Sequence, residues 1–88
     1  MQIEITNKFR KQLDKVNDRK IRSKLYLVIK DIEEANQLSE IQHLKKLKGH
    51  QSYYRIRMGD YRIGISIEKQ KVIFSAFDHR SAIYKYFP

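Results

Sequence analysis

Three consecutive segments that resemble β-strands, 53–58, 61–68 and 71–78, constrain the fold of this chain more than any other feature, and the first two alternate between polar or aromatic and aliphatic residues. A period of two residues is typical of β-strands that bury one face. Only Gly59-Asp60 separates the first pair, and only residues 69 and 70 separate the second. Gly59 supplies the positive φ that a two-residue turn needs, whereas the second break has no strong turn residue. The sequence therefore predicts three antiparallel strands in succession.

The segment before these strands is predicted to hold one further strand and two helices. Residues 1–6 alternate, and helically spaced apolar residues then follow, first after Asn7, which can cap a helix, and again across residues 18–35. We expect the two helices to form an antiparallel hairpin. Residues 43–52 show neither period and are predicted as a loop or an irregular strand. The helically spaced residues are Phe9, Leu13 and Val16 in the first helix and Ile21, Leu25, Val28 and Ile32 in the second.

These elements predict an α+β fold in the order β-α-α-β-β-β. We expect a small antiparallel sheet with the helical hairpin packed on one face, and a short C-terminal helix or turn over residues 79–88. A chain of 88 residues buries a single core, so residues 1–88 are expected to form one domain.

Composition narrows the possible functions. No apolar run approaches the roughly 18 residues needed to cross a bilayer, and the N-terminus lacks the apolar core of a signal peptide, so we expect a cytoplasmic protein without a membrane partner. The chain has no cysteine, and His43, His50 and His79 lack zinc-ligand spacing, so neither a metal nor another cofactor is expected. Nineteen Lys and Arg against ten Asp and Glu give a net charge of +9, which favours a polyanionic partner.

The predicted hairpin gathers arginine on one face of the sheet. A two-residue turn at 59–60 places Arg57 opposite Arg62 and puts Arg55 on the same face. Alternation extends this face through Gly64, Ser66, Ser75 and Phe77 to His79, with Arg80 adjacent, and we expect it to be open. The opposite face, toward the helices, is predicted to carry Ile56, Ile63, Ile65, Ile67, Val72, Phe74 and Ala76.

The pairing of Arg57 with Arg62 has a cost, because like charges directly opposite destabilise a strand pair by up to about 1 kcal/mol. A bound anion would offset this cost, and the planar fork of arginine suits phosphate. The alternative is that these arginines serve solubility and protect the sheet edge. Tyr53 and Tyr54 allow two interpretations in the same way, stacking on a nucleic-acid base or packing against the sheet.

The second half of the chain resembles the RelE/ParE superfamily of bacterial toxin-antitoxin toxins, most closely its RelE-like branch. The resemblance is carried by Leu47 to Gly49 in an L-x-G element, by YRIRMGDYR at residues 54–62, and by a hydrophobic strand closing on HRSAIY at residues 79–84. It implies a RelE-like microbial RNase fold and a toxin that enters the ribosomal decoding site and cleaves messenger RNA without a metal. It also implies an antitoxin that holds the toxin inactive.

The resemblance implies roles for individual residues. Arg62 matches the arginine that stabilises the scissile phosphate, and Tyr84 matches a C-terminal tyrosine implicated in proton transfer or base stacking. Arg55 and Arg57 match basic strand residues that contact RNA, and Tyr54 is a candidate for base stacking. Lys45, Lys46 and Lys48 are expected to attract messenger and ribosomal RNA, or else to form a solvated charged loop.

One position departs from the pattern. The RelE toxins have a second catalytic arginine two positions before the arginine aligned with Arg80, and here that position is Asp78. Either Arg80 or His79 takes over part of its role, or activity is weakened. His79 is a candidate acid or base, since an imidazole titrates near neutrality, and its alternative role is to anchor the terminal segment. Asp78 is expected to pair with Arg80 or Arg62.

Two other functions remain open. A ParE-like toxin would use this scaffold to inhibit DNA gyrase without cutting RNA, and the missing arginine favours that interpretation. A degenerate toxin would bind only its antitoxin. The full set of hairpin arginines favours the nuclease.

Overall fold

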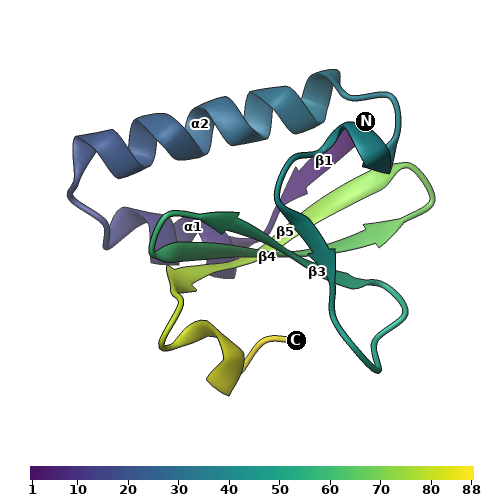
Figure 1. The fold of residues 1–88 in the computed structure, drawn as a ribbon. Helices are drawn as coiled ribbons and strands as arrows, with labels where there is room; N and C mark the ends of the chain where they lie inside the picture. The colour runs from purple at the N-terminus through teal and green to yellow at the C-terminus, as the bar shows by residue number, and fades with distance from the viewer.

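The computed structural model describes residues 1–88 as two helices and a five-stranded sheet, with the strand order β1-β5-β4-β3-β2 (Figure 1). The predicted α+β class and the order of the main elements are confirmed. Neither helix is long and apolar enough to span a membrane. The elements are β1 (Gln2–Ile5), α1 (Asn7–Asp14), α2 (Arg19–Glu34), a 3₁₀ turn η1 (Leu38–Glu40), β2 (Leu44–Lys46), β3 (Tyr53–Met58), β4 (Tyr61–Glu68), β5 (Lys71–His79) and a 3₁₀ turn η2 (Ile83–Lys85).

The first strand is parallel to its neighbour, which corrects the prediction of a wholly antiparallel sheet. β1 pairs with β5 so that Ile3 lies beside Val72 and Ile5 beside Phe74. Alternation in a sequence does not encode strand direction, because either direction buries the same face of β1. The parallel arrangement starts α1 next to the middle of β5, where Phe9 packs edge-on against Phe74 with ring centroids 5.4 Å apart.

Side-chain caps start both helices. The hydroxyl of Thr6 accepts a hydrogen bond from the Phe9 amide at 3.2 Å, so Thr6 and not Asn7 caps α1. Thr6 also donates from this hydroxyl to the Phe74 carbonyl at 2.8 Å, which ties the start of the helix to the sheet. Asp18 caps α2 by accepting from the Lys20 amide at 2.9 Å. Each cap satisfies a backbone donor that the first helical turn leaves free.

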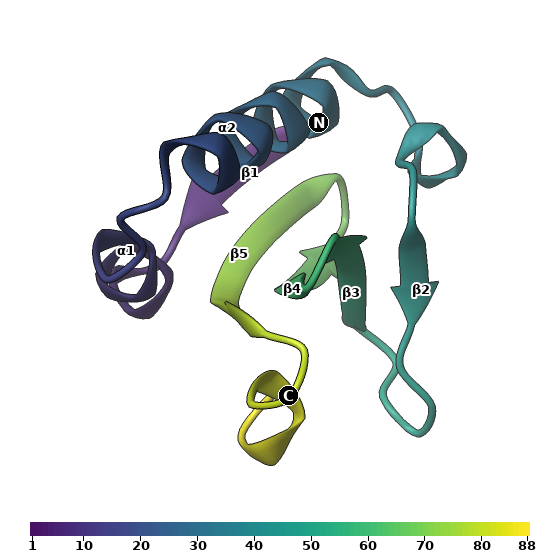
Figure 2. The same ribbon diagram turned by 60° about the vertical axis from the view of Figure 1, so that its left-hand side comes forward.

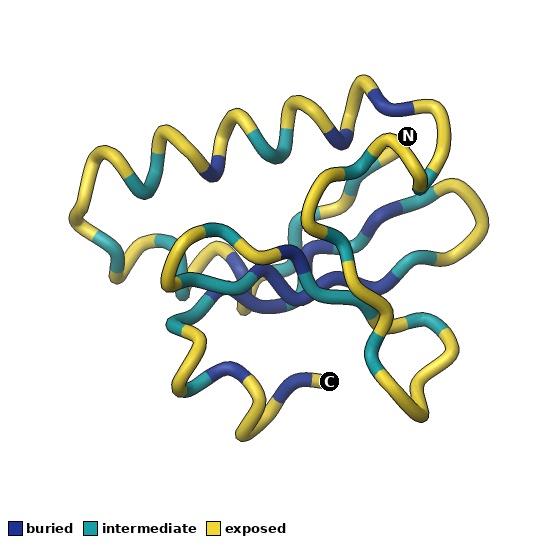
Figure 3. The backbone as a smooth tube through the Cα atoms, viewed as in Figure 1, coloured by how far each residue is buried: buried dark blue, intermediate teal, exposed yellow.

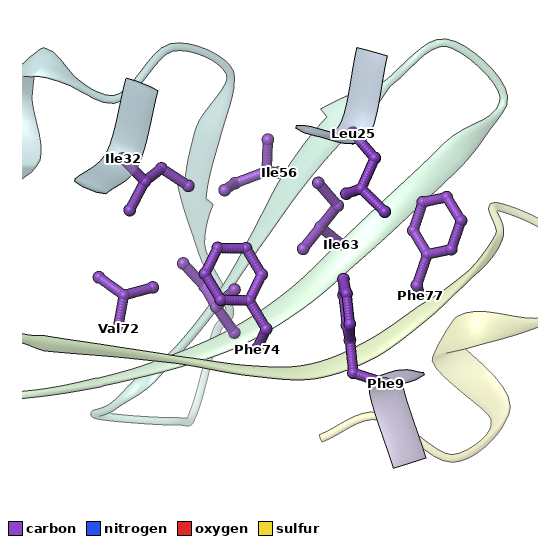
Figure 4. Packing of buried hydrophobic residues seen from close by; sticks show 9 residues of the cluster. Phe9, Leu25, Ile32, Ile56, Ile63, Val72, Phe74 and Phe77 are labelled. Atoms are coloured by element: carbon purple, nitrogen blue, oxygen red, sulfur yellow. The ribbon is translucent and has the colours of Figure 1, made fainter. Parts of the chain in front are cut away.

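The main core lies between the helices and one face of the sheet (Figures 2 and 3). Apolar side chains of α1 and α2 point toward those of β3, β4 and β5, as Figure 4 shows. This burial stabilises the helices, which are too short to persist alone in water. The buried cluster contains Phe9, Leu25, Ile32, Ile56, Ile63, Ile65, Val72, Phe74 and Phe77.

A β-bulge in β5 reverses part of the predicted alternation. Ile65 pairs with Phe74 and Gly64 pairs with Ala76, so Ser75 has no partner across the ladder. An unpaired residue shifts every later side chain to the opposite face. Phe77 therefore joins the main core and Ala76 faces the other side, the reverse of the prediction for both. The same shift pairs Asp78 with Arg62 and His79 with Tyr61, so Asp78 and not His79 continues the face of Arg62.

The second face of the sheet, predicted to be open, is partly covered by the C-terminal segment. Residues 79–88 fold back along the side of the sheet away from α2 (Figure 1). Ile83 and Phe87 are buried against Ala76, with Leu47 packed beside them. The Phe87 ring lies so close to Gly64 that a Cβ there would be 2.8 Å from it. Only glycine leaves room for this contact.

Candidate nucleic-acid interface

A basic cleft of about 700 Å³ lies on the second face, between the C-terminal segment and the turn that follows β2. Six of its lining side chains are lysine or arginine, and none is acidic. A concave surface with one sign of charge focuses the field and raises the local concentration of anions. We call it the basic cleft; its lining residues are Lys45, Lys46, Leu47, Lys48, Arg55, Arg62, His79, Arg80, Ser81 and Tyr84.

Backbone carbonyl groups hold the two strand arginines of the basic cleft. Arg62 donates from Nη1 to the carbonyls of Gly59 and Tyr61, at 2.8 and 2.9 Å. Arg55 donates from Nη1 to the carbonyl of His43 at 3.1 Å. The other guanidinium N–H groups of both residues have no protein partner. A guanidinium group that is already held in place and still has free N–H donors can bind a phosphate group with little loss of side-chain entropy.

Arg57 does not line the basic cleft. It lies directly opposite Arg62 in the ladder, as predicted, and is exposed. β3 extends past the end of β2 at this point, and Arg57 lines a separate cavity of about 480 Å³ beside α2. That cavity also includes Asp31, Glu34 and Glu40. Arg57 therefore lies next to the basic cleft, in a cavity whose other charged side chains include three carboxylates.

Arg80 and His79 are held where β5 turns into the C-terminal segment. The Arg80 amide donates to the Asp60 carbonyl at 2.8 Å, and its guanidinium lies 4.0 Å from the Asp60 carboxylate. Both side chains are exposed, so this ion pair is weak. His79 accepts at Nδ1 from the Ser81 amide at 3.1 Å, and its ring lies edge-on to Tyr61. This geometry favours the tautomer with the proton on Nε2.

Of the three tyrosines considered as candidates, only Tyr84 lies in the site. Tyr84 lines the basic cleft with 49% of its surface exposed and makes no side-chain hydrogen bond. Tyr54 packs against the main core on the helix side, so the structure does not bring it together with Arg55. Tyr53 lies edge-on to both His50 and Phe87 on the second face, outside the basic cleft.

Asp78 pairs with neither Arg62 nor Arg80, which corrects the prediction. Its carboxylate accepts from the His79 amide at 2.8 Å and from the Tyr86 hydroxyl at 2.9 Å. Partial burial, reinforced by this hydrogen bond to Asp78, raises the pKa of Tyr86 above its ordinary value of 10.0. The hydroxyl is therefore neutral and able to donate across the physiological range.

Sequence reasoning missed Gln12, whose amide donates to the Tyr86 hydroxyl oxygen and accepts from the Phe77 amide at 2.9 Å. One signal was available: Gln12 follows Phe9 by three residues and precedes Val16 by four, so a polar residue falls on the apolar face of a helix. Such a residue needs a buried partner. No pattern in the sequence indicates that the partner is Tyr86.

The fold and the basic cleft can be compared with known proteins. The profile of the family described as the ParE toxin of type II toxin-antitoxin systems, parDE, matches residues 3–84. Toxin RelE3 of Methanocaldococcus jannaschii is 44% identical over 69 residues, which cover 77% of this chain and 78% of the relative.

Solved structures agree. The RelB-RelE antitoxin-toxin complex from Methanococcus jannaschii contains a chain with a TM-score of 0.81 and 39% identity, over 96% of this chain and 98% of that one. The RelBE2 toxin-antitoxin complex from Mycobacterium tuberculosis matches with a TM-score of 0.69 and 20% identity, over 91% of each chain. YafQ from E. coli matches with a TM-score of 0.69 and 16% identity, over 94% of this chain and 97% of YafQ. At these lower identities the likeness is one of fold.

The chain belongs to the RelE/ParE superfamily of toxins. Within it, the chain is a toxin of a type II toxin-antitoxin system, homologous to the RelE toxins.

Proposed function

We propose that this toxin is an endoribonuclease that cuts messenger RNA on the ribosome. The observation that carries the proposal is the basic cleft itself, where six lysine and arginine residues and Tyr84 converge without a carboxylate among them. The cleft has the charge to bind an RNA backbone, and Tyr84 offers a ring and a hydroxyl to a bound nucleotide.

The proposed reaction is attack of a ribose 2′-hydroxyl on the adjacent phosphate, which forms a 2′,3′-cyclic phosphate as the 5′-oxygen leaves. The free donors of Arg62 stabilise the charge that develops on the phosphoryl oxygens, a role for which tethering is an advantage. Arg80 adds a second positive charge, and His79 and Tyr84 transfer protons. Because these groups supply charge and proton transfer, the proposed mechanism needs no metal ion.

The remaining basic residues bind the RNA strand. Lys45, Lys46, Lys48 and Arg55 line the same cleft and provide contacts to successive phosphates. We assign Arg57, which is exposed outside the cleft, to the binding of ribosomal RNA.

The second partner is an antitoxin. Two of the similar solved structures are toxin-antitoxin complexes, RelB-RelE and RelBE2. A net charge of +9 favours an acidic antitoxin, since charge complementarity speeds association and neutralises the surface that binds RNA.

The test is to add the purified toxin to ribosomes carrying a defined messenger and to map the new RNA ends. We expect cuts in the decoding site, with Arg62→Ala lowering the rate at least about a hundredfold, as loss of an anion-stabilising donor does, and Tyr84→Phe lowering it less. Arg10→Ala, which removes an exposed arginine on α1, should cut like the wild type. Near-normal cutting by Arg62→Ala would contradict the proposed role of Arg62.

Inhibition of DNA gyrase is the second candidate, because the matching family profile is that of the ParE toxins and because Asp78 replaces a basic residue of the RelE pattern. A gyrase supercoiling assay on the same preparation separates the two. Inhibition of supercoiling together with intact messenger would replace the nuclease proposal.

A further inference from the structure

Three polar side chains from distant parts of the chain meet at the hydroxyl of Tyr86. Tyr86 donates to Oδ2 of Asp78 in β5 at 2.9 Å and accepts from the amide of Gln12 in α1. Gln12 is itself fixed by the Phe77 amide, which donates to its Oε1 at 2.9 Å. We call Gln12, Asp78 and Tyr86 the C-terminal clamp. Each hydrogen bond to Tyr86 joins the last residues of the chain to the helix or the sheet.

Apolar contacts hold the same segment from its other side. Ile83 is fully buried against Ala76, and the Phe87 ring covers Gly64. η2 contains only three residues, so its own backbone hydrogen bonds do not keep it folded. The position of the segment therefore depends on these contacts and on the clamp.

Tyr84 lies between the anchored positions. Ile83 precedes it and Tyr86 follows two residues later, while Tyr84 itself is half exposed in the basic cleft and has no hydrogen bond of its own. In a 3₁₀ turn, successive side chains point about a third of a turn apart, so anchoring the flanking residues fixes the direction of the one between them. The place of Tyr84 in the cleft is thus set by its neighbours.

We propose that Asp78 is a positioning residue, which holds Tyr84 in the basic cleft by fixing Tyr86. This inference rests on the proposed function of the cleft and deepens it. The carboxylate at position 78 then contributes to the activity of the site, and the absence of an arginine there is not a loss of function. An arginine at this position has only donors, so it would leave the Tyr86 hydroxyl without an acceptor.

The test uses Asp78→Ala, Asp78→Arg, Asp78→Asn and Tyr86→Phe, with Asp31→Ala as a control that removes an exposed carboxylate from α2. Two quantities are measured: the hydrogen exchange of the Tyr86 and Phe87 amides, which both donate to the Ile83 carbonyl, and kcat and KM for messenger cleavage on ribosomes. The first reports on the segment whether or not RNA is cut.

For Asp78→Ala, Asp78→Arg and Tyr86→Phe we expect exchange of the two amides to be about tenfold faster. We expect kcat to fall about tenfold with KM within about twofold of wild type, since misplacing Tyr84 affects the reaction more than RNA binding. Asp78→Asn keeps one acceptor oxygen, which can serve Tyr86 or the His79 amide but not both. It should therefore retain more activity than Asp78→Ala but less than the wild type, and Asp31→Ala should match the wild type in both measurements.

Unchanged exchange in Asp78→Ala would overturn the clamp. Faster exchange with an unchanged kcat would overturn the positioning of Tyr84, and so would faster cleavage by Asp78→Arg than by the wild type. If the wild-type toxin cuts no messenger, the proposed function fails and the positioning role fails with it, while the exchange of the Asp78 variants still shows whether the clamp exists.

Discussion

Arg57 and Arg62 are directly opposite each other in the β3–β4 ladder, with no carboxylate within ion-pair distance of either. Strand alternation places both side chains on the same face of the sheet, with Arg62 lining the basic cleft and Arg57 outside it. The pair opposes folding, which agrees with the proposed role of these arginines in binding RNA.

Removing one of these charges should therefore stabilise the protein. Arg57 makes no side-chain hydrogen bond, and threonine suits an exposed strand position. We expect Arg57→Thr to raise the free energy of unfolding by about 0.5 kcal/mol at low salt, with the gain shrinking as salt is added. Urea denaturation at two salt concentrations measures it, with Arg10→Thr on α1 as the control. Loss of stability in Arg57→Thr would show that the arginine pair is not repulsive.

The lysines of the basic cleft should control the salt dependence of RNA binding. For a single strand, the slope of log affinity against log salt falls by about 0.7 for each phosphate that the protein no longer neutralises. Changing Lys45, Lys46 and Lys48 together to alanine should therefore lower the slope by about 2. The matched control changes Lys20, Lys24 and Lys30, which are exposed on α2, and removes the same net charge. Binding of a short single-stranded RNA by fluorescence anisotropy measures both slopes. Equal slopes for the two triple variants would mean that the attraction comes from net charge alone.

His79 should be required for cleavage. Its Nδ1 accepts from Ser81, so Nε2 is the nitrogen free to exchange a proton with RNA. Asparagine can place an oxygen near the position of Nδ1 and so keep the anchor while losing the ability to transfer a proton. We expect His79→Asn to lower cleavage about a hundredfold, as the loss of a group that transfers protons does. A normal rate for His79→Asn, together with a defect in His79→Ala, would assign His79 to anchoring alone.

The parts of the fold that local patterns encode were predictable. The register of Arg57 with Arg62 follows from the turn at Gly59, and the helices follow from apolar residues at intervals of three and four. The bulge at Ser75 was not predictable, because the apolar residues at 72–74 and 76–77 are consecutive and so are compatible with more than one choice of buried face. It moves Asp78 to the face of Arg62, and so the predicted position of His79 in the sheet was wrong although His79 still lines the basic cleft.

The set of residues that form the site was predictable only in part, because local sequence patterns do not encode contacts between distant segments. Arg55, Arg62 and Tyr84 come together through strand register and chain reversal, which a motif can indicate. The contact of Gln12 with Tyr86 joins residues 74 positions apart and depends on how α1 packs against β5. Of the two interpretations of Tyr54, the structure shows packing against the main core, on the face that alternation with Ile56 assigns to it.

Any side chain at position 64 should destabilise the protein while Phe87 is present. A Cβ at Gly64 would be 2.8 Å from the Phe87 ring, so either this ring or the C-terminal segment that carries it must shift. We expect Gly64→Ala to destabilise the protein by about 1–3 kcal/mol through this overlap. Phe87→Leu shortens the opposing side chain, and the double variant should be more stable than the sum of the single effects predicts, by at least about 0.5 kcal/mol. Urea denaturation of the four proteins measures the coupling, and simple additivity would place the cost of Gly64→Ala elsewhere.

The pKa of Tyr86 should respond in opposite directions to its two partners. Burial raises the pKa above 10.0, the hydrogen bond to Asp78 raises it further, and the hydrogen bond from Gln12 lowers it because that donor stabilises the phenolate. Asp78→Asn should therefore lower the pKa of Tyr86, and Gln12→Leu should raise it. Alkaline titration of tyrosinate absorbance measures both shifts, with Tyr86→Phe subtracted to isolate the one group. A shift in the same direction for both variants would show that they act by loosening the segment and not through the hydroxyl.

The raised pKa also fixes the sign of a stability effect. The folded state holds the Tyr86 proton more tightly than the unfolded chain, in which tyrosine titrates near 10.0. The contribution of this group to stability is therefore complete below pH 10.0 and is lost as the pH rises through the higher pKa of the folded state. The stability difference between the wild type and Tyr86→Phe should be constant from neutral pH up to about pH 10.0 and should then shrink as the pH rises further. A difference that grows with pH above it would mean that the ionised form is the one the fold prefers, which would contradict a hydroxyl that donates to Asp78.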